Sequence, residues 1–199
     1  MDQTTLEGLR QTLEARCILR GDFTLASGKT SHYYYNGKAG MLAGAAKVTL
    51  ARALWDLAAG IEFDTLGGPA VGAVPLVEHM AVVSALERDR EIDTFYVRSE
   101  KKDHGTESAV FQGLQEDGAE LLVPGARALV VEDALTTGGS IRVALEAVEA
   151  AGAVVAGVLL VADRQDPDAD WLRNGYEYRA LFNVSLDGEL EVPAVPQTA

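Results

Sequence analysis

The segment LVVEDALTTGGSI, residues 129–141, has the residue types and the spacing to bind a phosphorylated sugar. Two adjacent acids, Glu132 and Asp133, come first, and five residues that can surround an anion follow: Thr136, Thr137, Gly138, Gly139 and Ser140. Glycines let backbone N–H groups close around a phosphate, hydroxyls add donors, and a helix after the turn directs free N–H groups at the anion. The carboxylates can accept hydrogen bonds from sugar hydroxyls or help to hold Mg²⁺. Neither GxxxxGK[ST] nor GxGxxG occurs, so the segment is neither a P-loop nor a dinucleotide-binding fingerprint. An anion-binding turn preceded by two acids predicts a site for a ribose phosphate.

A plainer interpretation of the same segment is a helix capped by Ser140 and preceded by two solvated acids. We consider it the weaker one, because the apolar residues before Glu132 predict a buried strand. Two adjacent acids at the end of such a strand need a partner, since an unpaired buried charge is costly.

The segment VVEDALTTGGS resembles the motif with which type I phosphoribosyltransferases bind phosphoribosyl diphosphate (PRPP). Four other segments resemble the orotate phosphoribosyltransferase family within that group, in the family's order: FTLASGKTSHYYYN (23–36), GGPAVGAVPL (67–76), RSEKKDHG (98–105) and DRQ (163–165). The resemblance implies transfer of the phosphoribosyl group from PRPP to orotate. The products are orotidine 5′-monophosphate and pyrophosphate, on the route of pyrimidine (UMP) synthesis.

The charged segment 98–105 suits such a reaction on physical grounds. As the bond from ribose C1′ to pyrophosphate stretches, negative charge builds on the leaving group, and cations held there stabilise the transition state more than the ground state. Arg98, Lys101 and Lys102 supply cations, and His104 can donate a hydrogen bond or a proton. A closing loop would also exclude the water that hydrolyses PRPP. The alternative is a solvated, charged surface loop.

The resemblance assigns residues to each part of the reaction. It implies that Lys102, His104 and Asp133 are catalytic. The PRPP-binding set that it implies comprises Arg98, Lys101, Lys102, His104, Glu132, Asp133, Ala134, Leu135, Thr136, Thr137, Gly138, Gly139 and Ser140. The orotate-binding set comprises Tyr34, Tyr35, Thr136 and Arg164. Mg²⁺ is expected as a cofactor held mainly by PRPP, with no direct protein ligand. The resemblance also implies a homodimer in which the 98–112 loop is shared across subunits.

Three departures from the family pattern each remove an expected positive charge. Ser99 stands where the loop usually has lysine, Ala26 where members often have lysine, and Val71-Gly72 where some have Tyr-Lys. They support one alternative, a non-catalytic PRPP-binding regulator. A phosphoribosyltransferase for another nucleobase is a second alternative, which RSEKKDHG and Arg164 disfavour. Packing of the N-terminal segment is an equal alternative for Tyr35.

Alternating strands and helices are expected to position these residues. Helices are predicted over 3–17, 41–59, 73–87 and 140–151, and strands over 63–66, 94–98, 126–131, 153–162 and 178–183. This order predicts an α/β fold, an open, mainly parallel sheet flanked by helices, as in type I phosphoribosyltransferases. Ligands of such sheets bind beyond the carboxyl ends of the strands, here the loops 67–72, 99–112, 132–140 and 163–168. Residues 1–40 are expected to form an N-terminal helix and a hood over the base site, and residues 41–199 the core.

Composition narrows the class of protein further. The chain has 199 residues, with 17 Lys plus Arg against 30 Asp plus Glu, and its formal net charge of −13 disfavours nucleic acid as a partner. Its single cysteine, Cys17, excludes an intrachain disulfide and is expected to be a buried apolar residue. No signal peptide is visible, and no apolar run approaches the roughly 20 residues of a membrane span, so the expected compartment is the cytosol.

Overall fold

A seven-stranded sheet forms the centre of the molecule in the computed structural model, which describes residues 1–24, 30–98, 110–112 and 120–193. Its strand order is β5-β4-β3-β6-β7-β8-β9. The five inner strands run parallel, and the short outer strands β5 and β9 are antiparallel to their neighbours. The strands are β3 (Thr65–Pro69), β4 (Thr94–Val97), β5 (Val110–Gln112), β6 (Arg127–Leu135), β7 (Val154–Asp163), β8 (Tyr178–Val184) and β9 (Leu190–Glu191).

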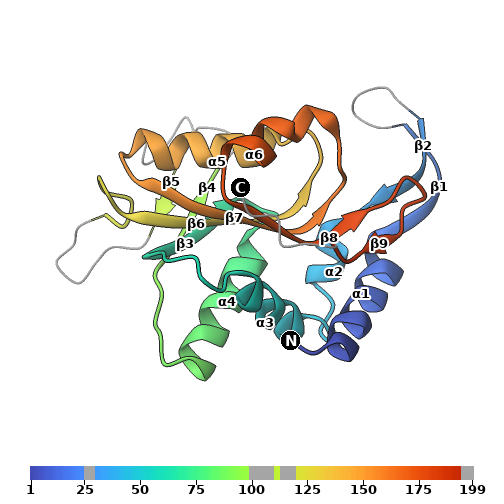
Figure 1. The fold of residues 1–199 in the computed structure, drawn as a ribbon, viewed down its shortest axis with the longest axis horizontal. Helices are drawn as coiled ribbons and strands as arrows, with labels where there is room; N and C mark the ends of the chain where they lie inside the picture. Colours follow the sequence, from blue (N-terminus) through green and yellow to red (C-terminus); the bar gives the residue numbers. More distant parts are fainter. Residues whose placement is uncertain (25–29, 99–109, 113–119, 194–199) are drawn as a thin grey trace.

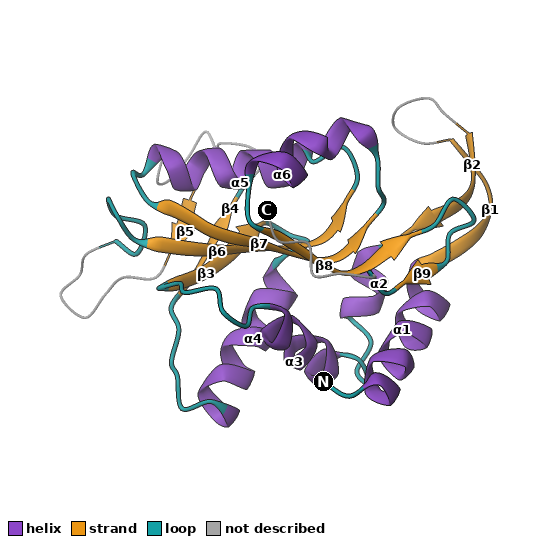
Figure 2. Ribbon diagram, in the orientation of Figure 1, coloured by secondary structure: helices purple, strands orange, loops and turns teal. Residues whose placement is uncertain are grey.

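Helices cover both faces of this sheet (Figures 1 and 2). On one face lie α1 (Gln3–Cys17), α3 (Lys47–Leu57) and α4 (Val74–Glu87). On the other lie α5 (Gly139–Ala150) and the short α6 (Asp170–Gly175), which follows a 3-10 turn at Pro167–Ala169. The predicted α/β architecture with an open, mainly parallel sheet flanked by helices is confirmed. No helix in the described part of the chain is long and apolar enough to cross a membrane.

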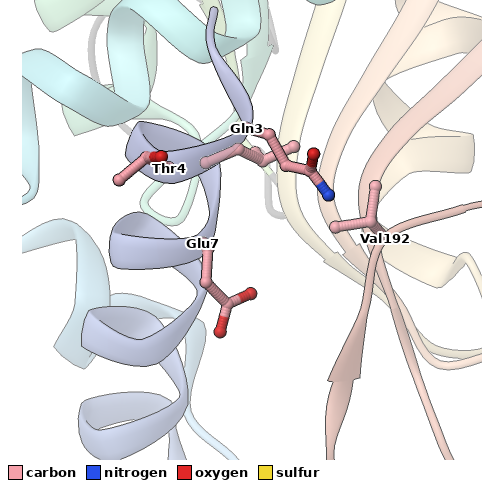
Figure 3. A pocket seen from close by; sticks show the side chains of 5 residues that line it. Gln3, Thr4, Glu7 and Val192 are labelled. Atoms are coloured by element: carbon pink, nitrogen blue, oxygen red, sulfur yellow. The ribbon is translucent and has the colours of Figure 1, made fainter.

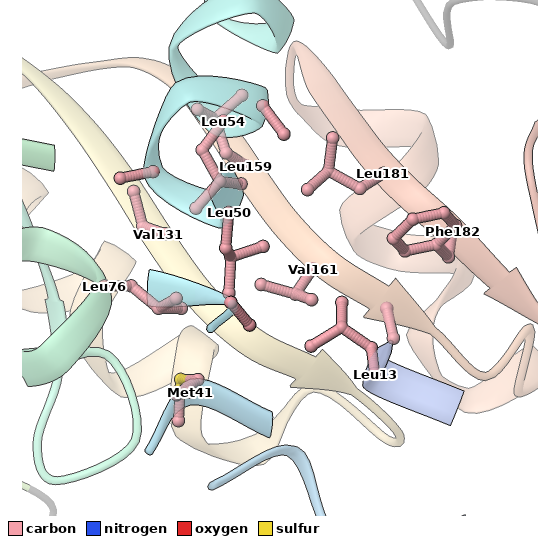
Figure 4. Packing of buried hydrophobic residues seen from close by; sticks show 14 of the residues in the cluster. Leu13, Met41, Leu50, Leu54, Leu76, Val131, Leu159, Val161, Leu181 and Phe182 are labelled. Carbon is pink, nitrogen blue, oxygen red and sulfur yellow. The ribbon is translucent and has the colours of Figure 1, made fainter. Parts of the chain in front are cut away.

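Alternate residues of the central strands build two hydrophobic layers. In β6, Leu129 and Val131 face α1, α3 and α4, whereas Ala128 and Val130 face α5. Figure 4 shows the first layer, in which Leu50 and Leu54 of α3 pack against Val131 and the neighbouring strands. Because successive side chains of a strand point to opposite faces, a strand buried on both faces is apolar throughout. The same alternation fixes the faces of the residues that follow Val131.

The N-terminal residues add a second, smaller sheet beside the first. Strands β1 (Ile18–Thr24) and β2 (Thr30–Tyr35) pair antiparallel with each other, and the five-residue helix α2 (Gly37–Met41) leads back to the main body. Helix α1 anchors this part, because its Leu9, Leu13 and Cys17 belong to the core that α3 and α4 share. The boundary at residue 40 between hood and core stays a prediction.

Several predicted boundaries differ from those of the structure. The helix predicted over 41–59 begins only at Lys47, and the residues before it form α2 and a turn. Strand β3 runs to Pro69, so Gly67 and Gly68 belong to a strand and not to the predicted loop. Strand β6 likewise continues through Glu132 and Asp133 to Leu135. Strands β5 and β9 and helix α6 were not predicted, because segments this short show no periodicity.

Candidate active site

The end of β6 carries the two acids on opposite faces of the sheet. Glu132 continues the row of Ala128 and Val130 and points toward α5, whereas Asp133 continues the row of Leu129 and Val131 and points toward α2. The carboxylates nevertheless meet at the strand end: a β-carbon built on Gly72 would lie 3.0 Å from Asp133 Oδ1 and 3.1 Å from Glu132 Oε1. Both carboxylates therefore lie beside Gly72 at the carboxyl end of β6, although one side chain faces α5 and the other faces α2.

Glu132 is the buried member of the pair, with 3% of its surface exposed. The Ser140 hydroxyl of α5 donates a hydrogen bond of 2.7 Å to its Oε2. Burial, and secondarily the neighbouring Asp133 charge, raises the pKa of Glu132 well above its ordinary value. Ser140, predicted as a phosphate ligand, thus supports Glu132 in this structure, and its helix is capped by Gly138 rather than by Ser140.

Asp133 is only partly buried and is enclosed by glycine backbone. A β-carbon on Gly37, the first residue of α2, would overlap Asp133 Oδ2 and lie 2.9 Å from Cγ. Gly72 closes the other side of the same carboxylate. At the departure Val71-Gly72, a side chain on residue 72 would meet both acids at 3.0–3.1 Å, so the carboxylates would have to shift by a few tenths of an ångström.

The turn after β6 has the geometry of an anion cradle. Gly138 has a φ of +81°, a left-handed conformation that favours glycine, and it begins α5 by accepting a 2.9 Å hydrogen bond from the Arg142 N–H. The first N–H groups of α5 lack partners within the helix and face outward from its start. Thr137, Gly139 and Ser140 are exposed there, while Thr136 is half-buried. These features fit a phosphate group.

Arg164 lies next to this turn, because its backbone N–H donates a 2.9 Å hydrogen bond to the Leu135 carbonyl. Its guanidinium lies 5.3 Å from the centre of the Tyr33 ring, and its buried Nε has no hydrogen-bond partner in the described residues. Tyr33 also packs on the β8–β9 turn, where a β-carbon at Gly188 would lie 2.6 Å from its Cγ. A planar cation beside an aromatic face is thus available to an anionic, planar ligand.

Tyr33, which lies beside Arg164, is not among the predicted base-binding residues, whereas its two neighbours are. Tyr34 lies on the opposite face of the β1–β2 hairpin, is exposed and packs against Phe23 with ring centroids 5.8 Å apart. Tyr35 is buried, and burial, together with Cys17 and Asp133 nearby, raises the pKa of its phenol. The period of two along a strand is the signal that separates Tyr33 and Tyr35 from Tyr34. The roles of Tyr34 and Tyr35 toward orotate stay predictions.

Other predicted site residues are placed less fully. Arg98 is half-buried just after β4, and Ala134 and Leu135 are part of β6. Lys101, Lys102 and His104, as well as the departures at Ala26 and Ser99, lie outside the described residues. Cys17 is fully buried as expected, and burial raises the pKa of its thiol to about 11.

A pocket elsewhere on the molecule contains none of these residues. It lies between α1 and the end of β9 and is lined by Gln3, Thr4, Leu6, Glu7 and Val192 (Figure 3). The chemistry-bearing residues instead meet where β6 and β7 end, at the carboxyl edge of the sheet.

Comparison with known proteins decides the family. Residues 42–187, well over half of the chain, match the family described as phosphoribosyl transferase domain. The chain belongs to the phosphoribosyltransferase family. The acids of β6 and the turn at 136–140 lie within the matched residues.

This phosphoribosyltransferase is 38% identical to the orotate phosphoribosyltransferase of Streptomyces avermitilis over 84% of its own length and 87% of that relative. It is 40% identical to that of Pyrococcus furiosus, over 80% and 81% of the two chains. Among solved structures it resembles the orotate phosphoribosyltransferase of Mycobacterium tuberculosis at 29% identity. The TM-score is 0.75 for the complex with Fe(III) dicitrate (92% and 99% covered) and 0.69 for that with PRPP (90% and 96%). The resemblance to orotate phosphoribosyltransferases is confirmed.

The Gly37→Ala substitution is expected to lower kcat/KM of this phosphoribosyltransferase by about tenfold to a hundredfold, because the new β-carbon displaces Asp133. Steady-state kinetics and a thermal melt measure the effect. Gly44→Ala is the matched control, since a β-carbon there meets no atom within 4 Å. Full activity in Gly37→Ala would show that the position of Asp133 is not critical.

Proposed function

We infer that this chain is an orotate phosphoribosyltransferase, which transfers the 5-phosphoribosyl group from PRPP to orotate in pyrimidine synthesis. One observation carries the inference: a single strand, β6, delivers two carboxylates and an anion-binding turn to the same edge. Curated relatives of this name, matched over most of the chain, support the choice of orotate.

The described residues suit the PRPP half of the reaction. The turn at 136–140 and the start of α5 take the 5′-phosphate, since free N–H groups and the helix dipole favour an anion. Asp133, the more accessible acid, accepts hydrogen bonds from the ribose hydroxyls and holds C1′ in place while the bond to pyrophosphate breaks. A ring nitrogen of orotate attacks C1′ from the opposite side, so the configuration there inverts and pyrophosphate leaves with the bonding electrons.

The leaving group requires cations, which we assign to the 98–112 loop. Following the resemblance, Arg98, Lys101, Lys102 and His104 bind the pyrophosphate, and Lys102 and His104 stabilise the negative charge that develops on it. The same loop would reach the site of a second subunit in a homodimer. Light scattering gives the mass that tests the dimer.

The base half depends on Arg164 beside Tyr33. A guanidinium binds a carboxylate through two parallel hydrogen bonds, and orotate is the pyrimidine that carries a carboxylate. The resemblance assigns further contacts with the base to Thr136, Tyr34 and Tyr35, although Tyr34 lies on the hairpin face opposite Tyr33 and Tyr35 is buried. The buried Nε of Arg164, which has no partner in the described part of the chain, supports a ligand at this position.

Mg²⁺ is proposed as the cofactor, bound mainly by oxygens of PRPP and by water. The described residues contain no group of three or more His, Cys, Asp or Glu side chains suited to a metal ion. The two carboxylates at Gly72 fit an ion brought in with the substrate, because Mg²⁺ prefers oxygen ligands and retains water. When bound, the ion neutralises charge on the pyrophosphate. We place the reaction in the cytosol, in line with the single buried cysteine.

A turnover assay tests this function against its alternatives. Orotate with PRPP and Mg²⁺ is expected to give orotidine 5′-monophosphate, followed by the change in pyrimidine absorbance. Preference for a purine or for uracil would establish a transferase for another base. PRPP binding without turnover of any base would support a regulator.

A further inference from the structure

Helix α6 contacts both the turn at 136–140 and the turn after β7, and it has no role in the function described above. Two of its six residues contact different turns. Trp171 contacts the turn at the start of α5, and Arg173 binds Asp163 at the end of β7 and the Asp166 carbonyl in the turn that follows. The first of these turns is assigned to the 5′-phosphate of PRPP and the second carries Arg164. One short helix therefore contacts both the turn assigned to PRPP and the turn that carries the orotate-binding residue Arg164.

Trp171 packs directly on Gly138, the residue that caps the start of α5. A β-carbon on Gly138 would lie 2.8 Å from Trp171 Cζ2 and 3.2 Å from Nε1, so the indole fills the space that a side chain would occupy. The Arg142 guanidinium of α5 covers the indole at 3.8 Å from its centre, and Tyr176 meets it edge-on at 6.2 Å. The ring is thereby held against the turn, which limits the movement of Gly138.

Arg173 fixes the residue that precedes Arg164. Its guanidinium binds Asp163 through two parallel bonds, Nη2 to Oδ1 at 2.7 Å and Nε to Oδ2 at 2.9 Å. Asp163 is fully buried and accepts two more bonds, from the Tyr178 hydroxyl at 2.6 Å and the Gln165 N–H at 2.8 Å. With its carboxylate satisfied on several sides, Asp163 has one position, and the backbone of Arg164 is set with it.

We propose that α6 is a positioning element for both substrates: Trp171 holds the turn that binds the 5′-phosphate, and Arg173, through Asp163, holds Arg164 for the carboxylate of orotate. The proposal rests on the proposed function. Neither side chain is assigned a contact with substrate. Each side chain acts through one neighbour. Changes at Trp171 should therefore affect the KM for PRPP, and changes at Arg173 the KM for orotate.

The first test is the Trp171→Ala variant, compared with Trp171→Phe. We expect Trp171→Ala to raise the KM for PRPP by about tenfold and to leave the KM for orotate within about twofold, because only the phosphate turn loses its support. Trp171→Phe keeps a ring over Gly138 and is expected to restore most of the affinity. Trp55→Phe is the matched control, since Trp55 packs on the other face of the sheet and donates to Met80.

The second test uses Arg173→Lys and Tyr178→Phe. Lysine cannot form the paired bonds to Asp163, so the KM for orotate is expected to rise by about tenfold while the KM for PRPP stays unchanged. Breaking a buried ion pair can also unfold a protein, and Tyr178→Phe removes only one neutral donor from the same carboxylate. Arg179→Lys is the control: its side chain is as exposed as that of Arg173, 15% in both, and it binds Glu177.

Equal changes in both KM values, in step with the loss of thermal stability, would overturn the proposal and leave α6 a packing element. No change in either KM would overturn it as well. A wild-type protein that does not turn over orotate contradicts the proposed function instead. Calorimetry with ribose 5-phosphate then still decides the Trp171 half, because Trp171→Ala must raise the dissociation constant by about tenfold.

Discussion

The Asp133→Asn variant is expected to lose turnover by at least about a hundredfold without losing stability. The amide keeps the size of the carboxylate between Gly37 and Gly72 but loses the charge that binds the ribose hydroxyls and balances the cationic sugar of the transition state. The reference is the wild type under saturating PRPP and orotate, with the melting temperature measured on the same samples.

The Asp133→Asn variant also has an expected effect on thermal stability. Burial, and secondarily the charge of Asp133, raises the pKa of Glu132 in the folded protein. Between pH 4.5, the ordinary pKa of glutamate, and this raised pKa, the folded protein keeps a proton that the unfolded chain releases. The corresponding stability is present below pH 4.5 and is lost as the pH rises through the raised pKa. Removing the charge of Asp133 lowers that pKa, so Asp133→Asn should melt at the same or a higher temperature in neutral buffer.

Asp64→Asn is the matched control at the opposite end of the sheet. Asp64 binds Arg127 at the start of β6, and this ion pair lowers the pKa of the Asp64 carboxyl to about 2. Its amide variant is expected to lose some stability and keep its activity. Parallel losses of activity and melting temperature in Asp133→Asn would contradict a catalytic role for Asp133.

The Gly68→Ala variant is expected to lose about 3 kcal/mol or more of unfolding free energy. A β-carbon there would overlap the Val131 carbonyl oxygen and lie 2.7 Å from the Ala73 β-carbon. Because the obstacle is the backbone of β6 and not a flexible side chain, relief requires β3 and β6 to separate. Such a loss is a large share of the roughly 5–15 kcal/mol that stabilises a typical domain. Denaturant titration measures it.

Gly8→Ala gives the contrasting result. Gly8 lies inside α1, and a β-carbon built there meets nothing within 4 Å. Alanine is the better helix former by about 1 kcal/mol, so this variant should be slightly more stable than the wild type. If Gly68→Ala unfolds at the wild-type midpoint, the close approach of β3 to β6 does not limit stability.

Residue pattern alone predicted the parts of the fold with clear periodicity. The continuous apolar run before Glu132 and the run at 153–162 correctly indicated buried parallel strands, and the TTGGS turn correctly preceded a helix. The end of β6 was misjudged because Glu132 and Asp133 are charged, and their burial depends on partners that local sequence does not show. Ser140, eight residues away, is the partner of Glu132.

The parts of the site that sequence could not predict depend on long-range contacts. Gly37 approaches Asp133 from a segment almost a hundred residues earlier, and Gly72 approaches from a third. Trp171 packs on Gly138 from a later segment of the chain, and the local sequence does not show that contact. The sequence around a glycine does not show which neighbour occupies the space left by its missing side chain.

The short outer strands of the sheet have a consequence for the protein in concentrated solution. An exposed sheet edge is a template for pairing with another molecule, and long, flat edges promote aggregation. Here the outermost strands β5 and β9 are three and two residues long and run against the direction of the inner ones. The formal charge of −13 adds repulsion between molecules. The long central strands that carry the site are thus shielded from intermolecular strand exchange by the brevity of their outer neighbours.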